Sequence, residues 1–438
     1  MMINKMTITN RSSLLFYILC GYLFLYIERP WEIWTSLAPF HLERIYMLMA
    51  LFIFTFWGRK KIRWGAHPIL VLTFLALHYI LSPFAFSPAA ALDQGFEYFK
   101  MTVFFFLIIW SIQDEPELRK LIKVYIWIMF IYMAHSAWEY HNGRHVWRMG
   151  ISRMIGVDQF ANDPNTFSAS IALSIPFLWF LWKTEEKKFS KWLYLAYAGL
   201  ALVCVVLTGS RSGFAVTIFS IILVLIWGKG FFKKMGFLFG VAILLVGLWH
   251  FIPAEKQGRL KTLWNPESGP ANALESAEGR LEGLKAGWQM FSENPLTGVG
   301  PGGNNFMGYR MAHLDGIRLQ AHNLIGELLG ELGLLGAIVF IGQIMVIWLM
   351  SGKKLRPCVF NEIKGGSDNL FLGSACRQTL LLLLFGGLSG HNLYRINWLW
   401  IGGWSFLCFH WRREKLLTGL REDLEKEFNV NYLKDIKP

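Results

Sequence analysis

Charged residues are scarce in this chain of 438 residues: Asp, Glu, Lys and Arg make up 17% of it, whereas hydrophobic residues make up 54%. Soluble domains are about a quarter charged, so the composition argues against an ordinary soluble protein. The apolar residues gather in stretches of about 15 to 20 residues that recur from end to end, a length that crosses a bilayer as a helix. We therefore expect an all-α polytopic membrane protein.

Several familiar catalytic signatures are also missing. The sequence contains no P-loop, dinucleotide fingerprint, His-Glu-x-x-His run or nucleophile elbow. Its five cysteines lie in apolar segments or in one basic loop, which predicts no disulfide framework. His141 and His145 are four residues apart, but Asn142-Gly143 breaks any helix between them, and the only nearby carboxylate is Glu139. We expect neither a metal nor a cofactor.

The apolar stretches predict about twelve membrane-spanning helices. The first lacks a small-residue cleavage site, so we interpret it as a retained helix and not a signal peptide. The twelve predicted segments are residues 13–28, 44–58, 68–83, 95–112, 121–138, 165–182, 191–208, 212–228, 235–252, 322–350, 370–389 and 394–411.

The distribution of basic residues predicts the orientation of these segments. If the N-terminus is inside, the lysine-containing clusters all fall on the cytoplasmic side, and the short outer connections contain arginine but no lysine. The net charge of +13 is therefore interpreted as a topology signal, and no nucleic-acid partner is expected. This places helices one to nine in 1–252, a large outer loop in 253–321, helices ten to twelve in 322–411, and a cytoplasmic tail in 412–438.

The large outer loop is predicted to contain an amphipathic helix that lies over the membrane-embedded part. Leu281, Leu284, Trp288 and Phe291 recur at helical spacing, and Asn294-Pro295 ends the run. A glycine-rich stretch follows and predicts a flexible or tightly turning segment. Its glycines are Gly298, Gly300, Gly302 and Gly303.

Arg211 lies in a tight reversal, Thr208-Gly209-Ser210-Arg211-Ser212-Gly213. The apolar run after it, from Phe214 to Trp227, has only 14 residues. At about 1.5 Å per residue it spans roughly 21 Å, less than the hydrocarbon core of ~30 Å. Two interpretations follow: Arg211 is recessed and faces a polar cavity or an anionic ligand, or it extends to the interface.

His322 stands at the predicted start of the tenth segment, where a polar loop meets a membrane helix. A single histidine there is more often a capping or interface residue, but a neutral imidazole is well suited to accept a proton near neutral pH. In the helix that follows, Gly326 and Gly330 predict close approach of another helix. Glu327 and Glu331 share a face that should point into the bundle or toward the headgroups.

Arg280 and a second His-Asn pair complete the candidates. Arg280 follows Gly279 at the predicted start of the surface helix, where a helix N-terminus and a guanidinium could hold phosphate, although a solvated arginine is the commoner case. His391-Asn392 repeats the pair of His322-Asn323 on the same outer face. It could form a second wall of a cavity or an ordinary short loop, and we favour the loop.

Taken in order, these motifs resemble the O-antigen ligase and O-antigen polymerase superfamily. The resemblance rests on residues 209–213, on Gly279-Arg280 with Trp288, on 294–300, on His322-Asn323, and on Glu331, Gly333 and Gly336. Asn162-Asp163-Pro164-Asn165 before the sixth segment is similar to another recurring feature of that family. The predicted layout, with one large outer loop before a long helix, agrees as well.

The resemblance implies an inverting, metal-independent glycosyltransferase in the bacterial inner membrane, with both termini cytoplasmic and its site facing the periplasm. The donor would be a glycan on undecaprenyl diphosphate. His322 would be the catalytic base and Arg211 and Arg280 would bind the diphosphate, with candidate contacts from Asn323, Arg395, Arg153 and Asn165.

The acceptor is not decided by the sequence. A ligase passes the glycan to lipid A core, whereas a polymerase passes it to a second carrier-linked repeat, and we place the ligase slightly ahead. A transporter of lipid-linked polysaccharide is the alternative from another class. Transporters tend to show internal repeats and charged residues near the midplane, and this chain shows no repeat and few such residues.

Overall fold

The computed structural model describes residues 2–58, 60–148, 151–157, 163–227, 254–261, 272–352 and 366–434, with short pieces at 236, 239–240, 246–247 and 250. Helices dominate the described chain, which confirms the predicted all-α class. They are α1 (Met2–Glu28), α2 (Pro30–Ile33), η1 (Thr35–Phe40), α3 (Leu42–Phe56), α4 (Ala66–Leu81), η2 (Ser82–Phe84), α5 (Pro88–Ser111), α6 (Glu115–His141), α7 (Pro164–Thr184), α8 (Lys188–Leu207), α9 (Arg211–Trp227), α11 (Ala254–Lys261), α12 (Asn272–Glu293), α13 (Gly303–His313), α14 (Leu324–Met350), α15 (Gly366–Gly387) and α16 (Asn397–Lys434).

Eleven of the twelve predicted segments coincide with helices, and the ninth, 235–252, lies largely outside the described residues. Six helical stretches in the described chain are long and apolar enough to cross a membrane: Thr35–Phe56, Ala66–Phe84, Glu115–His141, Pro164–Thr184, Lys188–Leu207 and Leu324–Met350. Two shorter apolar helices, Arg211–Trp227 and Phe371–Gly387, add to them. The count of twelve spans stays a prediction. The predicted boundary at residue 411 is not a break in structure, because α16 runs through it.

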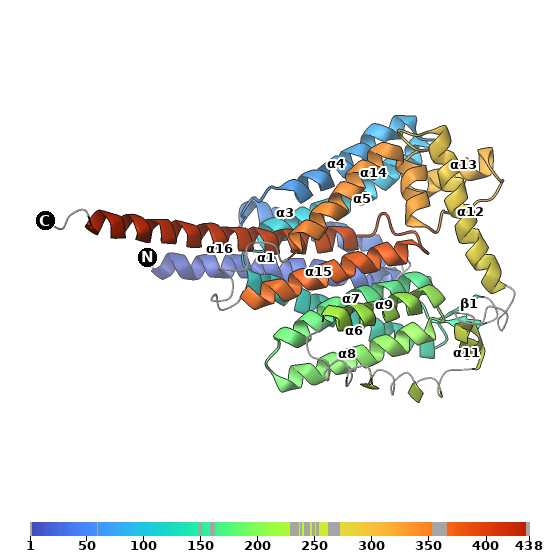
Figure 1. The fold of residues 1–438 in the computed structure, drawn as a ribbon. Coiled ribbons are helices and arrows are strands. Elements are labelled where there is room, and N and C mark those ends of the chain that lie inside the picture. Colours follow the sequence, from blue (N-terminus) through green and yellow to red (C-terminus); the bar gives the residue numbers. More distant parts are fainter. Residues whose placement is uncertain are drawn as a thin grey trace.

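The helices form an elongated bundle with two side groups (Figure 1). Helices α4, α5 and α14 pack together on one side, and α6, α7, α8 and α9 form the other, with α15 and α16 in contact with both groups. The two chain ends lie at one end of the bundle, and α12 and α13 lie at the opposite end, which we call the α12 end.

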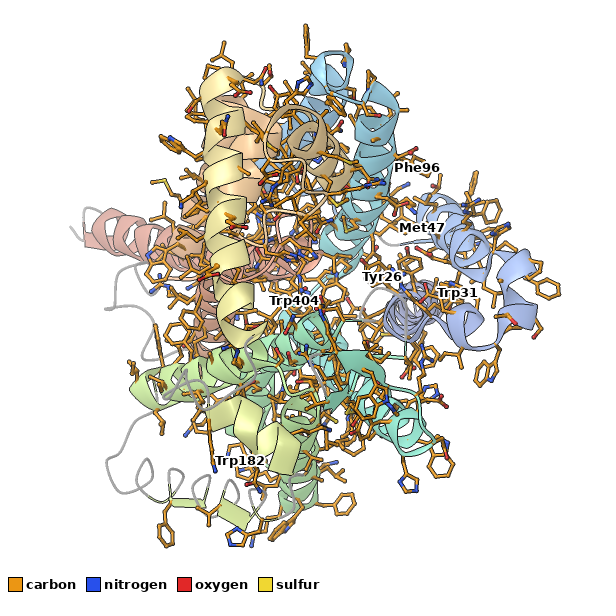
Figure 2. The ribbon with its side chains drawn as sticks, turned by 90° about the vertical axis from the view of Figure 1, so that its right-hand side faces the viewer. Tyr26, Trp31, Met47, Phe96, Trp182 and Trp404 are labelled. Carbon is orange, nitrogen blue, oxygen red and sulfur yellow. The ribbon has the colours of Figure 1, made fainter. Side chains whose placement is uncertain are left out.

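Aromatic side chains fill the middle of the bundle. Trp404 of α16 is 2% exposed and lies near the centre in Figure 2, which looks onto the α12 end. Its ring centroid is 4.7 Å from that of Phe177 of α7 and 5.8 Å from that of Tyr125 of α6. Contacts of this kind add to the hydrophobic gain of burying large rings, and they join the last helix to the α6–α7 side.

Arginine side chains cap helix C-termini at the end that holds the chain termini. Arg63 donates to the carbonyls of Ile109 at 2.8 Å and Ile112 at 2.9 Å, at the end of α5. Arg412 donates likewise to the carbonyl of Gly352 at 2.8 Å, after α14. The last carbonyls of a helix have no partner within it, and a cation there is also favoured by the helix dipole. Buried arginines thus satisfy groups that would otherwise be costly inside the bundle.

At the α12 end, α12 packs closely on the first half of α14 through glycine. A Cβ placed on Gly287 would lie 2.4 Å from the Gly326 carbonyl oxygen, and one on Gly283 would lie 2.1 Å from that of Ala321. The predicted close approach at Gly326 and Gly330 is confirmed. The helix also ends where predicted, at Glu293.

The apolar face predicted for this helix is buried in part: Leu284 and Phe291 are half-buried, whereas Leu281 and Trp288 are 54% and 58% exposed. The fully buried residues are Gly283, Ala286, Gly287 and Met290. A crossing this close excludes large side chains, so the small residues form the contact and the large ones are left outside it. Hydrophobic spacing alone could not reveal this.

Gly287→Ala should weaken this crossing. The added methyl group would overlap the backbone of α14, and overpacking of that kind costs about 1–3 kcal/mol. Gly199→Ala in α8 is the matched control, because its Cβ would meet no atom within 4 Å and alanine is favoured over glycine in a helix by about 0.5–1 kcal/mol. Thermal unfolding in detergent should show a lower midpoint for Gly287→Ala only, and equal midpoints would contradict the close packing.

Helix α14 is broken inside at Gly333, whose φ is 58° and ψ −156°. The segment after α12 pairs with the opened backbone: Val299 donates from its amide to the Gly330 carbonyl at 2.8 Å, and Leu334 donates to the Pro295 carbonyl at 2.9 Å. An interruption in an apolar helix is tolerated where the freed groups find partners. Of the two predicted alternatives, a flexible or a tightly turning segment, the glycine-rich stretch is thus the tightly turning one. The segment that contains it supplies hydrogen-bond partners for the backbone groups of α14 that the break leaves open.

Candidate functional site

A cavity of about 480 Å³ opens at the α12 end, where α7 and α9 of one side group meet α15 and α12. Its walls come from α7, α9, α12 and α15, and from the segments before α14 and α16. Arg148 adds to them from β1 (Val146–Arg148), which pairs with β2 (Ile151–Arg153) in a β-hairpin. The charged, imidazole and amide groups that line it are Arg148, Asp163, Asn165, Arg280, His322, His391, Asn392 and Arg395.

A second part of the same cavity is apolar. Leu173 of α7, Val216 of α9, and Leu382 and Leu383 of α15 line it. Val216, Leu382 and Leu383 lie about one to two turns from the polar ends of their helices, and Leu173 about two and a half turns, so the apolar wall continues from the polar wall along the bundle. A cavity built in this way suits a ligand with a charged head and a hydrocarbon chain.

His322 lines the cavity in a sparsely populated backbone conformation, with φ at 47°. The next residue, Asn323, begins α14: its side-chain oxygen accepts from the amides of Ile325 at 2.9 Å and Gly326 at 3.2 Å. Its amide group also donates to the Leu388 carbonyl at 3.1 Å. This cap explains how a left-handed residue is held at a fixed place, since such strain persists only where the surroundings impose it.

The surroundings of His322 favour its neutral form. Burial lowers its pKa, and the nearby charge of Arg280 lowers it further, while Asp163 acts in the opposite direction. An imidazole that is neutral at physiological pH can accept a proton. The position and the charge state therefore both suit a general base.

Arg280 lines the cavity from α12, but it is not at a helix N-terminus as the sequence suggested. Helix α12 begins at Asn272, so Arg280 lies beyond its second turn and the helix-dipole argument does not apply. Its pKa is lowered by burial and by the charge of Arg211. Two guanidinium groups near each other, one of them in a partly buried cavity, favour an anion as their ligand.

Arg211 is the first residue of α9, and its neighbours Ser212 and Gly213 line the cavity while Arg211 itself does not. The turn before it is closely held: the Ser210 hydroxyl donates to the Asn165 side-chain oxygen at 2.6 Å. A Cβ on Gly213 would lie 1.8 Å from the Ser168 hydroxyl oxygen. Helices α7 and α9 thus pack closely against each other at the first turn of α9, which Arg211 begins.

The other predicted contacts fall into two groups. Arg395 and Asn165 line the cavity, and Arg395 donates to the Thr166 hydroxyl at 3.2 Å. Arg153 is 1% exposed and donates to the Thr208 carbonyl at 2.8 Å and to Asn165 at 3.3 Å. Neither Arg153 nor Asn323 lines the cavity. Arg153 hydrogen-bonds to the lining residue Asn165, and Asn323 caps α14 directly after the lining residue His322.

The lining residues that were not predicted as site residues include His391, Arg148 and Asp163. His391 was assigned to an ordinary loop, yet its Nδ1 lies 3.2 Å from Nδ1 of His322. Arg148 lies at the end of β1, in a hairpin that the sequence did not predict, and its guanidinium is 3.8 Å from Asp163. Asp163 caps α7 by accepting from the Thr166 amide at 2.9 Å. The repeated His-Asn pair was the signal that could have pointed to His391.

Metal ligands do not gather in the described part of the chain: no group of three or more His, Cys, Asp or Glu side chains there could hold a metal ion. The positive charges of the cavity, by contrast, lie on arginine. What the arrangement can do chemically is to accept a proton at an imidazole and to bind an anionic group next to it.

Comparison with known protein families agrees with this chemistry. Residues 196–341 match the family model described as O-antigen ligase. No curated protein matches the chain. The matched region runs from α8 to the second half of α14 and so includes Arg211, Arg280, His322 and Asn323. Residues 196–341 thus form an O-antigen ligase family domain, and this match together with the apolar helices supports a membrane protein of the lipid-linked glycan transferase kind.

Proposed function

We propose that this protein transfers a glycan from undecaprenyl diphosphate to an acceptor hydroxyl by a metal-independent, inverting reaction on the periplasmic face of the bacterial inner membrane. The observation that carries the proposal is that His322, Arg280 and Arg395 line one cavity, which continues into an apolar wall. The preferred acceptor is lipid A core, which makes the protein an O-antigen ligase.

The proposed reaction is a single displacement at the anomeric carbon. The acceptor oxygen forms the new glycosidic bond while the bond from the anomeric carbon to the phosphate oxygen breaks, which inverts the configuration. The hydroxyl proton goes to Nε2 of His322, acting as general base. The leaving diphosphate takes the electron pair, and Arg280, with Arg395 and the nearby charge of Arg211, stabilises its negative charge.

The apolar wall gives the lipid part of the donor a place. A polyprenyl chain between α7, α9 and α15 would contact Leu173, Val216 and Leu383, and its diphosphate would then lie at the polar end, near Arg280. This arrangement holds the anomeric carbon close to the base, and such positioning is itself a large part of catalysis.

The proposal is tested with purified protein and a labelled lipid-linked glycan. In parallel reactions the second substrate is either lipid A core or additional donor. We expect labelled glycan on lipid A core, with inverted configuration and with little effect of EDTA. Longer carrier-linked chains in the second reaction would make the protein a polymerase. Absence of transfer in both, or strong inhibition by EDTA, would contradict the proposal.

The pH dependence of transfer should reflect the environment of His322. A general base works only when unprotonated, so activity is lost as the pH falls through its pKa. Because burial and Arg280 lower this pKa, the acid limb of kcat/KM should have its midpoint below the ordinary value of about 6.5. Arg280→Gln should move that midpoint upward. A midpoint above 6.5 in the unaltered protein would contradict this account of the site.

A further inference from the structure

His322 forms a pair with a second histidine, His391, in the segment between α15 and α16. The two Nδ1 atoms are 3.2 Å apart, and the ring centroids are 5.2 Å apart. Both residues line the cavity. A bond between two Nδ1 atoms requires that one of them carries the hydrogen and the other accepts it, so the pair fixes the tautomer of both rings together.

The segment that carries His391 is held from three sides. The Leu393 amide donates to the Glu327 carboxylate at 3.1 Å, and the Asn392 side chain donates to the Leu383 carbonyl at 2.8 Å. The Trp398 indole donates to the Asn392 carbonyl at 2.8 Å. Asn323, next to His322, donates in turn to the Leu388 carbonyl. These bonds connect both histidines to the same junction of α14 and α15.

The charges around the pair favour two neutral rings. The charges of Arg280 on α12, Arg148 on β1 and Arg310 on α13 lower the pKa of His322, that of Arg395 lowers the pKa of His391, and Asp163 of the α7 cap acts in the opposite direction on both. Burial is the largest effect, and it lowers the pKa of His391 to about 4. With both rings neutral, the pair holds one hydrogen between its Nδ1 atoms, and the lowered pKa of His391 opposes a second proton on that ring.

We propose that His391 is a positioning residue, whose Nδ1 accepts the hydrogen bond from Nδ1–H of His322 and so leaves Nε2 of His322 unprotonated toward the cavity. This inference rests on the proposed function, in which that Nε2 takes the acceptor proton. The opposite tautomer would place a hydrogen on Nε2 and block the base. When His322 gains its proton, the bond to His391 persists and stabilises the imidazolium, as the orienting member of a catalytic triad does.

Three variants of His391 separate this role from others. Asparagine offers an oxygen near the position of Nδ1, glutamine offers one near Nε2, and phenylalanine keeps the ring without an acceptor. His391→Phe and His391→Gln should lower kcat about 10- to 100-fold, the scale of losing part of general-base catalysis. His391→Asn should retain most of kcat. KM for the lipid-linked donor should change little in all three.

The outcomes are distinguishable. Equal kcat in the three variants, or a loss that appears in KM and not in kcat, would overturn the positioning role and make His391 at most a donor contact. If the phenylalanine variant does not fold, as judged by thermal unfolding in detergent, the comparison of asparagine with glutamine decides. His322→Ala is measured beside them: full transfer by that variant would instead end the proposed function, whereas its inactivity with unaffected His391 variants would end only this inference.

Discussion

His322→Ala should abolish measurable glycan transfer while leaving the protein folded. General-base catalysis contributes about 10²- to 10⁴-fold to a rate, and alanine removes the nitrogen atom that the proposed reaction requires. The fold should tolerate the change, since His322 precedes α14 and the cap of that helix is made by Asn323. The measurement is transfer of labelled glycan from a carrier-linked donor by purified variant, with donor binding followed separately.

His141→Ala is the matched control for this experiment. His141 ends α6, is exposed and does not line the cavity, so its replacement should leave transfer unchanged. The proposed mechanism loses its base if the His322 variant turns over normally. A loss of donor binding in that variant would assign His322 to the substrate contacts and not to proton transfer.

Arg280→Gln should lower kcat/KM about 10²- to 10³-fold, the range measured when one preorganised donor to a developing negative charge is removed. Glutamine keeps hydrogen-bonding capacity but not the charge. Arg280→Lys should recover only part of the activity, because an ammonium group cannot form the two parallel bonds of a guanidinium. This loss of kcat/KM should be seen with donors whose leaving group is a diphosphate, because that is the group Arg280 is proposed to bind.

Arg318→Lys is the control at the same end of the molecule. Arg318 is exposed in the segment after α13 and does not line the cavity, so kcat/KM should stay at the level of the unaltered protein. An Arg280→Lys variant with full activity would show that a single positive charge suffices there and would contradict a bidentate contact with phosphate.

The sequence predicted the helices well because the signal for them is local. Eleven of the twelve predicted apolar stretches coincide with helices, and Asn294-Pro295 marks the end of α12 as expected. Other features depended on partners distant in the chain. The buried face of α12 includes Gly283 and Gly287 because α14 passes so close, and the break of α14 at Gly333 is stabilised by the segment after α12.

The same distinction applies to the site. His322, Arg280, Arg395 and Asn165 were predicted from motifs, and all four line one cavity. His391 was missed because its meaning depends on His322, which is 69 residues away in the chain and 3.2 Å away in space. The role expected of Arg280 at a helix N-terminus was wrong because the helix begins earlier, at Asn272, than its apolar spacing indicated.

The most direct test of the account is an experimental structure of the protein in a lipid nanodisc with an undecaprenyl-diphosphate-linked glycan bound. The account predicts the diphosphate within hydrogen-bond distance of Arg280, the polyprenyl chain along Leu173 and Val216, and the anomeric carbon on the side of His322. Density for the donor at another surface, or a diphosphate remote from Arg280 and His322, would contradict it.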